Sequence, residues 1–176
     1  MLLKVLILIT INDFLCYLWK NSKKQKRLQM LIDKNNLPLV AEDFMNDVHF
    51  EDVDIINELH EKAINYRDNK TDENKESLIA SYEKWFEHTV NHFKGEEDKM
   101  LELRFPPYMM HKGEHDRCLE HMEQVLRSFK ETDDIDALVR YLEVDLTQWL
   151  VNHIQTMDTV TAMFFSTGMS PCSAMH

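Results

Sequence analysis

The sequence has few of the residues that form tight turns. Its 176 residues include only 3 Gly and 4 Pro. An all-β fold requires many tight turns, and these depend largely on such residues. The scarcity of both residue types therefore argues against an all-β fold.

Cysteine and basic residues are also scarce. The three cysteines, Cys16, Cys118 and Cys172, are too few and too scattered for a disulfide framework or a CxxC site. Lys and Arg number 20 against 31 Asp and Glu, which gives a net charge of −11. Because nucleic-acid binding depends on clustered Lys and Arg, we expect no nucleic-acid partner. Histidine, by contrast, is abundant, with 9 residues.

The first residues of the chain are apolar but interrupted by polar groups. Residues 2–19 contain Lys4, Asn12 and Asp13 among Leu, Ile, Val and Phe. The insertion free energies of these side chains sum to about zero, so the segment fits a membrane anchor and a partner-docking helix equally well. Basic residues follow between positions 20 and 27, and they would keep the rest of an anchored protein in the cytoplasm. We expect a cytoplasmic protein, with membrane contact through residues 2–19 left open.

The chain divides into four parts. Residues 1–33 form the N-terminal hydrophobic segment, and residues 34–42, which include the only Pro before Pro106, predict a linker. Residues 43–166 form a helical body, and residues 167–176 have the composition of a flexible tail.

Within the body, apolar residues recur at steps of three and four, as in amphipathic helices. The pattern predicts helices over about 43–67, 72–105, 108–130 and 133–165, with Thr71 and Thr132 as N-caps of the second and fourth. Four long helices joined by short loops pack most simply as an up-down bundle. The predicted fold class is therefore all-α: an antiparallel four-helix bundle with an extra N-terminal hydrophobic helix.

Each predicted helix carries ionisable side chains on its apolar stripe. In chain order these are His60, His92, Glu96, His111, His115, His153 and Asp158. Burying them without partners would cost several kcal/mol for each carboxylate. A bundle with a stability of about 10 kcal/mol could not carry that cost. The groups therefore pair with one another or bind a cation, and a metal centre in the bundle core is the simpler explanation.

The number and type of these ligands indicate the metal. Seven ligands exceed the four of a tetrahedral zinc site. They suit two ions that share bridging carboxylates, and imidazole with carboxylate suits iron. The segment from His111 to His115 reads HKGEH, which is not the HExxH metalloprotease signature. The chain has no ExxH motif, which excludes the ferritin-like di-iron proteins.

Four segments carry a family resemblance over about residues 44–160. They are DIINELH at 54–60, HFKGEEDKM at 92–100, HKGEH at 111–115 and WLVNHIQTMD at 149–158. In these segments the chain resembles the hemerythrins, specifically the bacterial ones. The resemblance implies an oxo- or hydroxo-bridged di-iron centre that binds dioxygen reversibly.

The resemblance also implies a role for each ligand. His111, His115 and His153 would hold one iron, while His60 and His92 would hold the second and leave one position open for dioxygen. Glu96 and Asp158 would bridge the two irons. The apolar residues available to line the open position, most of which we expect to be ordinary core, are Trp85, Phe86, Phe93, Leu150, Ile154 and Met157.

The function implied is that of an oxygen carrier, store or delivery protein without enzymatic activity, and an O₂-consuming enzyme is the expected partner. Two alternatives stay open: a di-iron module that senses O₂, NO or redox state, and an iron store or detoxifying oxidase. The sequence shows neither an output domain for signalling nor carboxylate-rich paths for storage, so we expect oxygen binding.

Asp158 needs a local change of helix geometry to act as a ligand. It follows His153 by five residues, which on an ideal α-helix is about 500°, or about 140° away from the ligand face. A π-bulge between them would bring Asp158 back to that face. We therefore predict a π-bulge within 153–158.

Other histidines are weaker candidates. His88 lies four residues before His92, and it fits either a hydrogen-bond partner of a ligand or a packed core imidazole. His49 precedes the apolar period of the first helix, so it is a poor candidate unless His60 fails.

Overall fold

The computed structural model describes residues 30–168. The predicted N-terminal hydrophobic helix and most of the predicted tail lie outside this range. In the described part of the chain, no helix has an apolar stretch long enough to cross a membrane.

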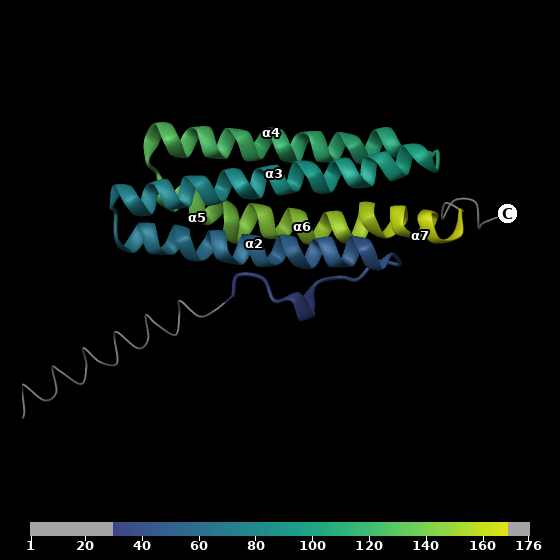
Figure 1. Cartoon of the computed structure of the whole chain (residues 1–176), viewed down its shortest axis with the longest axis horizontal. Coiled ribbons are helices and arrows are strands. Elements are labelled where there is room, and N and C mark those ends of the chain that lie inside the picture. The colour runs from purple at the N-terminus through teal and green to yellow at the C-terminus, as the bar shows by residue number, and fades with distance from the viewer. Residues whose placement is uncertain (1–29, 169–176) are drawn as a thin grey trace, which may run out of the picture. The chain divides into compact units, whose positions relative to one another are not determined.

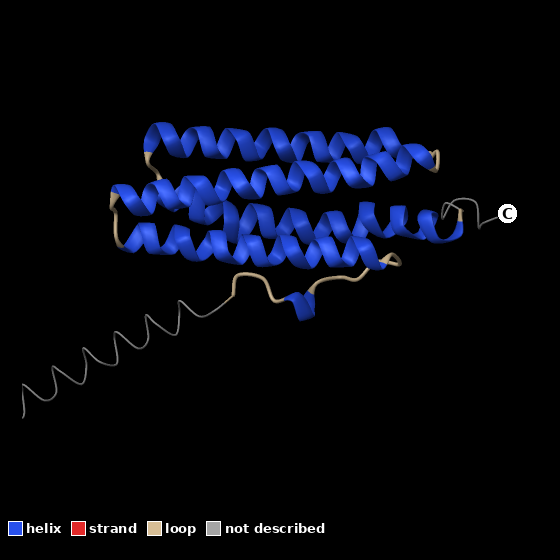
Figure 2. Ribbon diagram, viewed as in Figure 1, coloured by secondary structure: helices blue, strands red, loops and turns tan. Residues whose placement is uncertain are grey.

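The described residues form an antiparallel up-down bundle of four helical rods (Figures 1 and 2). The first three rods are α2 (Asp43–Asp68), α3 (Asp72–Glu102) and α4 (Tyr108–Thr132). The fourth is continuous and consists of α5 (Ile135–Arg140), η2 (Tyr141–Leu146), α6 (Thr147–His153), η3 (Ile154–Asp158) and α7 (Thr159–Thr167). Contacts link α2 to α3 and α5, and α4 to α3 and α5, which closes the ring of rods. The predicted all-α four-helix fold is confirmed.

Short polar segments set the ends of the rods. The Thr71 side chain accepts a hydrogen bond of 3.2 Å from the backbone N–H of Asn74, so it caps α3 as predicted. The fourth rod is capped by Asp134 rather than by Thr132, because Asp133 turns the chain with a left-handed φ of 57°. Each loop therefore reverses the chain within a few residues, which fixes the register of neighbouring helices.

Residues 31–41 pack against the bundle instead of forming a linker. They include a short 3₁₀ helix, η1 (Lys34–Asn36), and the buried side chains of Ile32, Leu37 and Val40. The Asn46 side chain accepts a 2.9 Å hydrogen bond from the Val40 N–H and donates another of 2.9 Å to its carbonyl. The segment predicted as a linker at 34–42 thus contributes to the core, because its apolar side chains Leu37 and Val40 gain more from burial than from solvent exposure.

The fourth rod contains two π-helical segments, η2 and η3. The predicted π-bulge between His153 and Asp158 is confirmed by η3, which spans Ile154–Asp158. Directly after each segment a threonine hydroxyl donates to the carbonyl five residues earlier, from Thr147 to Leu142 at 2.9 Å and from Thr159 to Ile154 at 2.8 Å. These hydroxyls satisfy carbonyls where the regular helical hydrogen bonding changes.

Candidate metal centre

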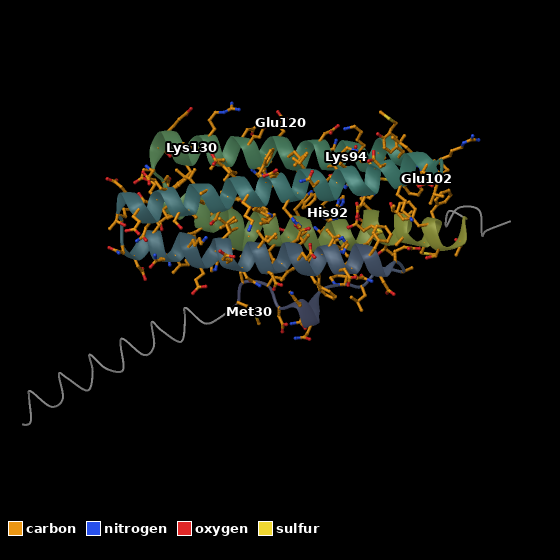
Figure 3. The ribbon with its side chains drawn as sticks, viewed as in Figure 1. Met30, His92, Lys94, Glu102, Glu120 and Lys130 are labelled. Carbon is orange, nitrogen blue, oxygen red and sulfur yellow. The ribbon has the colours of Figure 1, made fainter. Side chains whose placement is uncertain are left out.

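Six of the seven predicted ligands converge in the interior of the bundle. They are His92, Glu96, His111, His115, His153 and Asp158, which come from α3, α4, α6 and η3. Figure 3 labels His92 among the side chains that lie between the rods, near the middle of their length. The side chains of all six are at most 7% exposed.

The seventh predicted ligand, His60, lies elsewhere, and His49 takes the expected place. His60 Nε2 is 2.9 Å from Glu143 Oε1, and this glutamate is exposed to solvent. His49 is 1% exposed and its Nε2 lies 3.2 Å from Asp158 Oδ2. The two histidines are eleven residues apart in α2, or about 16 Å along the helix axis. The sequence-based choice of His60 is corrected accordingly.

Three imidazoles gather on one side of the two carboxylates. The Nε2 atoms of His111 and His153 are 3.1 Å apart, and both lie 3.2 Å from Asp158 Oδ1. The Nε2 atoms of His115 and His111 lie 3.5 Å and 3.7 Å from Glu96 Oε2. One oxygen of each carboxylate therefore faces this three-histidine group.

Two imidazoles gather on the other side. His49 Nε2 lies 3.2 Å from Asp158 Oδ2, and His92 Nε2 lies 3.2 Å from Glu96 Oε1. The second oxygen of each carboxylate therefore faces this two-histidine group. Glu96 and Asp158 each stand between the two groups and present one oxygen to each.

The outer ring nitrogens have partners of their own. The Nδ1 atom of His92 lies 2.7 Å from Asp52, that of His111 lies 2.8 Å from Thr161, and that of His115 lies 3.1 Å from Glu97. Such partners hold the proton on Nδ1 and leave the Nε2 lone pair for a metal ion. The orientation of these three rings is therefore set for ligation.

Several buried atoms at the centre of this cluster lack a hydrogen bond in the described part of the chain. They include His49 Nε2, His115 Nε2, Glu96 Oε2 and Asp158 Oδ1. Buried polar atoms without partners are rare and costly in proteins. All four point into the cluster, so a cation at each histidine group would satisfy them. The donor set, imidazole nitrogen with carboxylate oxygen, fits iron.

The charges in the cluster also favour a cation. Burial alone would raise the pKa of Asp158, but the close imidazoles of His111, His153 and His49 hold that pKa well below its usual range. The pKa of Glu96 is lowered too, because contacts with His115 and His92 outweigh burial and the nearby Asp158 charge. Both carboxylates are thus ionised at neutral pH, and buried negative charges of this kind are normally paired with cations.

Aromatic rings cover the three-histidine group. Phe93 stacks on His115 with ring centroids 3.8 Å apart and planes at 3°, and Trp149 stacks on His153 at 4.6 Å and 18°. These contacts fix the ring planes and exclude water from the ligand atoms. Trp85, Phe93 and Leu150, three of the residues expected near the open position, line a small cavity beside the cluster.

Sequence reasoning missed Asp52, the side chain that links His92 to the surface. Its Oδ2 binds His92 Nδ1 at 2.7 Å, and its Oδ1 lies 3.2 Å from His88 Nε2. The His88 side chain is 25% exposed, so it is neither a ligand nor a fully packed core group. Asp52 could have been noticed from its three-residue spacing to His49 on the buried stripe of α2.

Comparison with known proteins agrees with this geometry. Residues 40–164 match the family profile described as the hemerythrin HHE cation binding domain. The chain belongs to the hemerythrin family. A bacteriohemerythrin of Aquifex aeolicus (strain VF5) is 31% identical over 133 residues, which are 76% of this chain and 96% of that protein. A bacteriohemerythrin of Ralstonia nicotianae (strain GMI1000) is 31% identical over 87 residues, which are 49% of this chain and 62% of that protein. No solved structure matches the chain significantly.

This hemerythrin is therefore a di-iron-binding module of the bacteriohemerythrin type. The bundle brings its donor atoms into two groups, formed by Glu96 with His111, His115 and His153, and by Glu96 with His49 and His92. Within each group the donor atoms lie within 4.8 Å of one another.

Removing the charge of Asp52 should weaken iron binding at the two-histidine group. In Asp52→Asn the amide can still accept a hydrogen bond from His92, but it no longer increases the basicity of the ring. We expect the affinity for iron at the two-histidine group to fall by about 10–100-fold, which is the range for loss of such an outer partner. Competition against a chromogenic chelator measures this affinity. His88→Gln, which acts one residue further from the ligand, is the matched control, and an unchanged affinity in Asp52→Asn would show that Asp52 only fills space.

Proposed function

We propose that this hemerythrin binds dioxygen reversibly at its di-iron centre, as a carrier, store or delivery protein. His111, His115 and His153 would hold one iron, and His49 and His92 the other, with Glu96 and Asp158 bridging them. A pair of ferrous ions supplies the two electrons with which dioxygen can be held and then released. The chain's own residues set where the ligand binds and what surrounds it.

The observation that carries the proposal is the asymmetry of the two histidine groups. One group has three imidazoles and the other has two, while both share the same carboxylates. An iron held by the two-histidine group would therefore have one protein ligand fewer than the other iron. The cavity beside the cluster is lined by both members of the two-histidine group, His49 and His92, and by only one member of the three-histidine group, His153. The space lies on the side where the open position is expected.

The size and lining of this cavity suit a diatomic ligand. Its volume is about 20 Å³, which is near the minimum that holds a single water molecule. The apolar side chains of Trp85, Phe93 and Leu150 form part of its wall. A dry, apolar wall limits proton access to the bound ligand, and this favours release of dioxygen over its reduction. We infer binding without turnover, and an O₂-consuming enzyme is the partner that such a protein would supply.

Reversibility is the property to test. The full chain is loaded anaerobically with Fe(II), and metal analysis should find about two iron ions per chain. Cycles of air and argon should then make a ligand-to-iron charge-transfer band appear and disappear repeatedly. Protein loaded with Zn(II) is the control and should show no band. A band that forms once and never reverses would favour an oxidase, a redox sensor or an iron store instead.

A further inference from the structure

A second, larger pocket lies between α4 and the fourth rod. Its volume is about 450 Å³, and it is open to solvent. Its rim is polar, with Glu114, Arg117 and Gln148 among its residues. None of these rim residues belongs to the di-iron cluster.

The pocket and the ligand cavity share part of their lining. Cys118, Leu146 and Trp149 line both of them. The outer pocket therefore ends where the inner cavity begins, with one layer of side chains between them. Cys118 is 8% exposed and Leu146 is 4% exposed, so this layer is closed at rest.

The three side chains differ in how freely they can move. Trp149 is stacked on His153, a member of the three-histidine group, and is held in place. Leu146 is the last residue of the π-helical segment η2, where regular helical hydrogen bonding changes. Cys118 is small, and burial raises the pKa of its thiol to about 12, so it is an inert apolar group. Motion of Leu146 past Cys118 is the smallest change that would join the two spaces.

Leu146 lies in a part of the fourth rod where the helix geometry is π rather than α. The described part of the fourth rod has two π segments, and the second, η3, carries Asp158 to the cluster. π-Helical segments are rare and are frequently found at functional sites. The first, η2, places Tyr141 and Leu146 against the outer pocket and, through Leu146, against the inner cavity.

We propose that small ligands reach the di-iron centre from the pocket between α4 and the fourth rod, through a gate formed by Leu146 and Cys118 against the fixed ring of Trp149. The identity of dioxygen as the natural ligand rests on the proposed function, whereas the route itself does not. Narrowing or widening the gate should change how fast ligands arrive and leave without changing how tightly they bind.

The first test uses the full chain loaded with Zn(II), which fills the ligand cluster and does not depend on iron chemistry. The chain has three Trp residues, and in a Trp19→Phe background the remaining two, Trp85 and Trp149, line the route. Quenching of their fluorescence by dissolved O₂ gives a bimolecular rate constant for ligand penetration. We expect this constant to rise several-fold in Leu146→Ala and to fall in Cys118→Leu. Leu146→Val is a milder widening that serves if the alanine variant does not fold.

Leu138→Ala is the matched control. Leu138 is a buried leucine of the same rod, 2% exposed, and it lines neither the outer pocket nor the ligand cavity. It reports any general loosening that follows removal of a core leucine. Equal quenching constants in Leu138→Ala and Leu146→Ala would overturn the proposal, because the effect would then come from destabilisation alone.

The second test uses azide and the iron-loaded full chain in stopped-flow measurements. A gate changes the association and dissociation rate constants by the same factor and leaves Kd unchanged. A change in Kd alone in Leu146→Ala or Cys118→Leu would show that these residues act on the site, and it would overturn the gate. The quenching constants could change as expected in Leu146→Ala and Cys118→Leu while the iron-loaded protein fails to bind dioxygen reversibly. That result would support the route and reject only the proposed function.

Discussion

Replacing His49 with alanine should remove iron from the two-histidine group and abolish dioxygen binding, whereas replacing His60 should do neither. His49 Nε2 points at Asp158 from 3.2 Å inside the cluster, while His60 Nε2 contacts the solvent-exposed Glu143. Without His49, the second iron keeps a single imidazole and its share of the two carboxylates. We therefore expect the iron content to fall from about two ions per chain to about one, because the three-histidine group is intact.

The two variants make the same substitution in the same helix, and they differ in whether the replaced histidine belongs to the cluster. Both replace a histidine of α2 by alanine, and far-UV circular dichroism should show the same helix content in each. Iron per chain by elemental analysis and the reversible optical band are the two measurements. Normal iron content in His49→Ala together with loss of one iron in His60→Ala would restore the original sequence-based assignment and contradict the structure.

The register of the bundle explains why the sequence pattern misled at this one ligand. The apolar steps from Val53 through Ile56 include His60, and this indicated His60 as the inward-facing histidine. In the structure the buried stripe of α2 passes through His49, Asp52, Ile56 and Leu59, so His60 lies just beside it. The apolar periodicity of the sequence could not distinguish a buried position such as Leu59 from its neighbour His60 at the edge of the stripe.

The loop between α2 and α3 contains the signal that would have decided between the two histidines. Antiparallel helices pair residues at equal distances from their loop. His92 lies 22 residues after Lys70 and His49 lies 21 residues before it, whereas His60 lies only 10 before it. Counting outward from the loop therefore places His49 opposite His92. The ligands of α3, α4 and the fourth rod were predictable because each helix offered only one set of inward ionisable residues.

Once Asp158 is taken as a ligand, as the family resemblance implies, helix geometry is enough to predict the π segment there. The five-residue separation from His153 put the two ligands on different faces of a regular helix, and only a local change could reunite them. The segment η2 offered no such signal, because neither end of it carries a predicted ligand. Asp52 and Thr161 were missed for a related reason: an outer partner needs only one atom within reach of a ring nitrogen, and many spacings allow that.

Glu96→Gln should have the larger effect on the centre, because it affects both irons at once. Glu96 presents Oε2 to His115 and His111 and Oε1 to His92, so its carboxylate serves both histidine groups. An amide of the same shape carries no charge, and its NH₂ group must face one of the two groups as a donor rather than a ligand. We expect loss of iron from both positions, beyond the about 10–100-fold weakening caused by loss of an outer partner.

The neighbouring residue provides the control for this substitution. Glu97 lies outside the cluster, where its Oε1 accepts from His115 Nδ1 at 3.1 Å, and its amide counterpart in Glu97→Gln can still accept that bond. Glu97→Gln should weaken binding only as loss of an outer partner's charge does, by about 10–100-fold, so with excess Fe(II) the iron content should stay at about two per chain. In Glu96→Gln the iron content should approach zero under the same conditions. The thermal midpoints of the two metal-free variants should be compared as well, since Glu96→Gln must remain folded for the result to report on ligation. If folded Glu96→Gln kept both irons, the two histidine groups would bind metal independently, and a shared carboxylate could not be what holds the pair together.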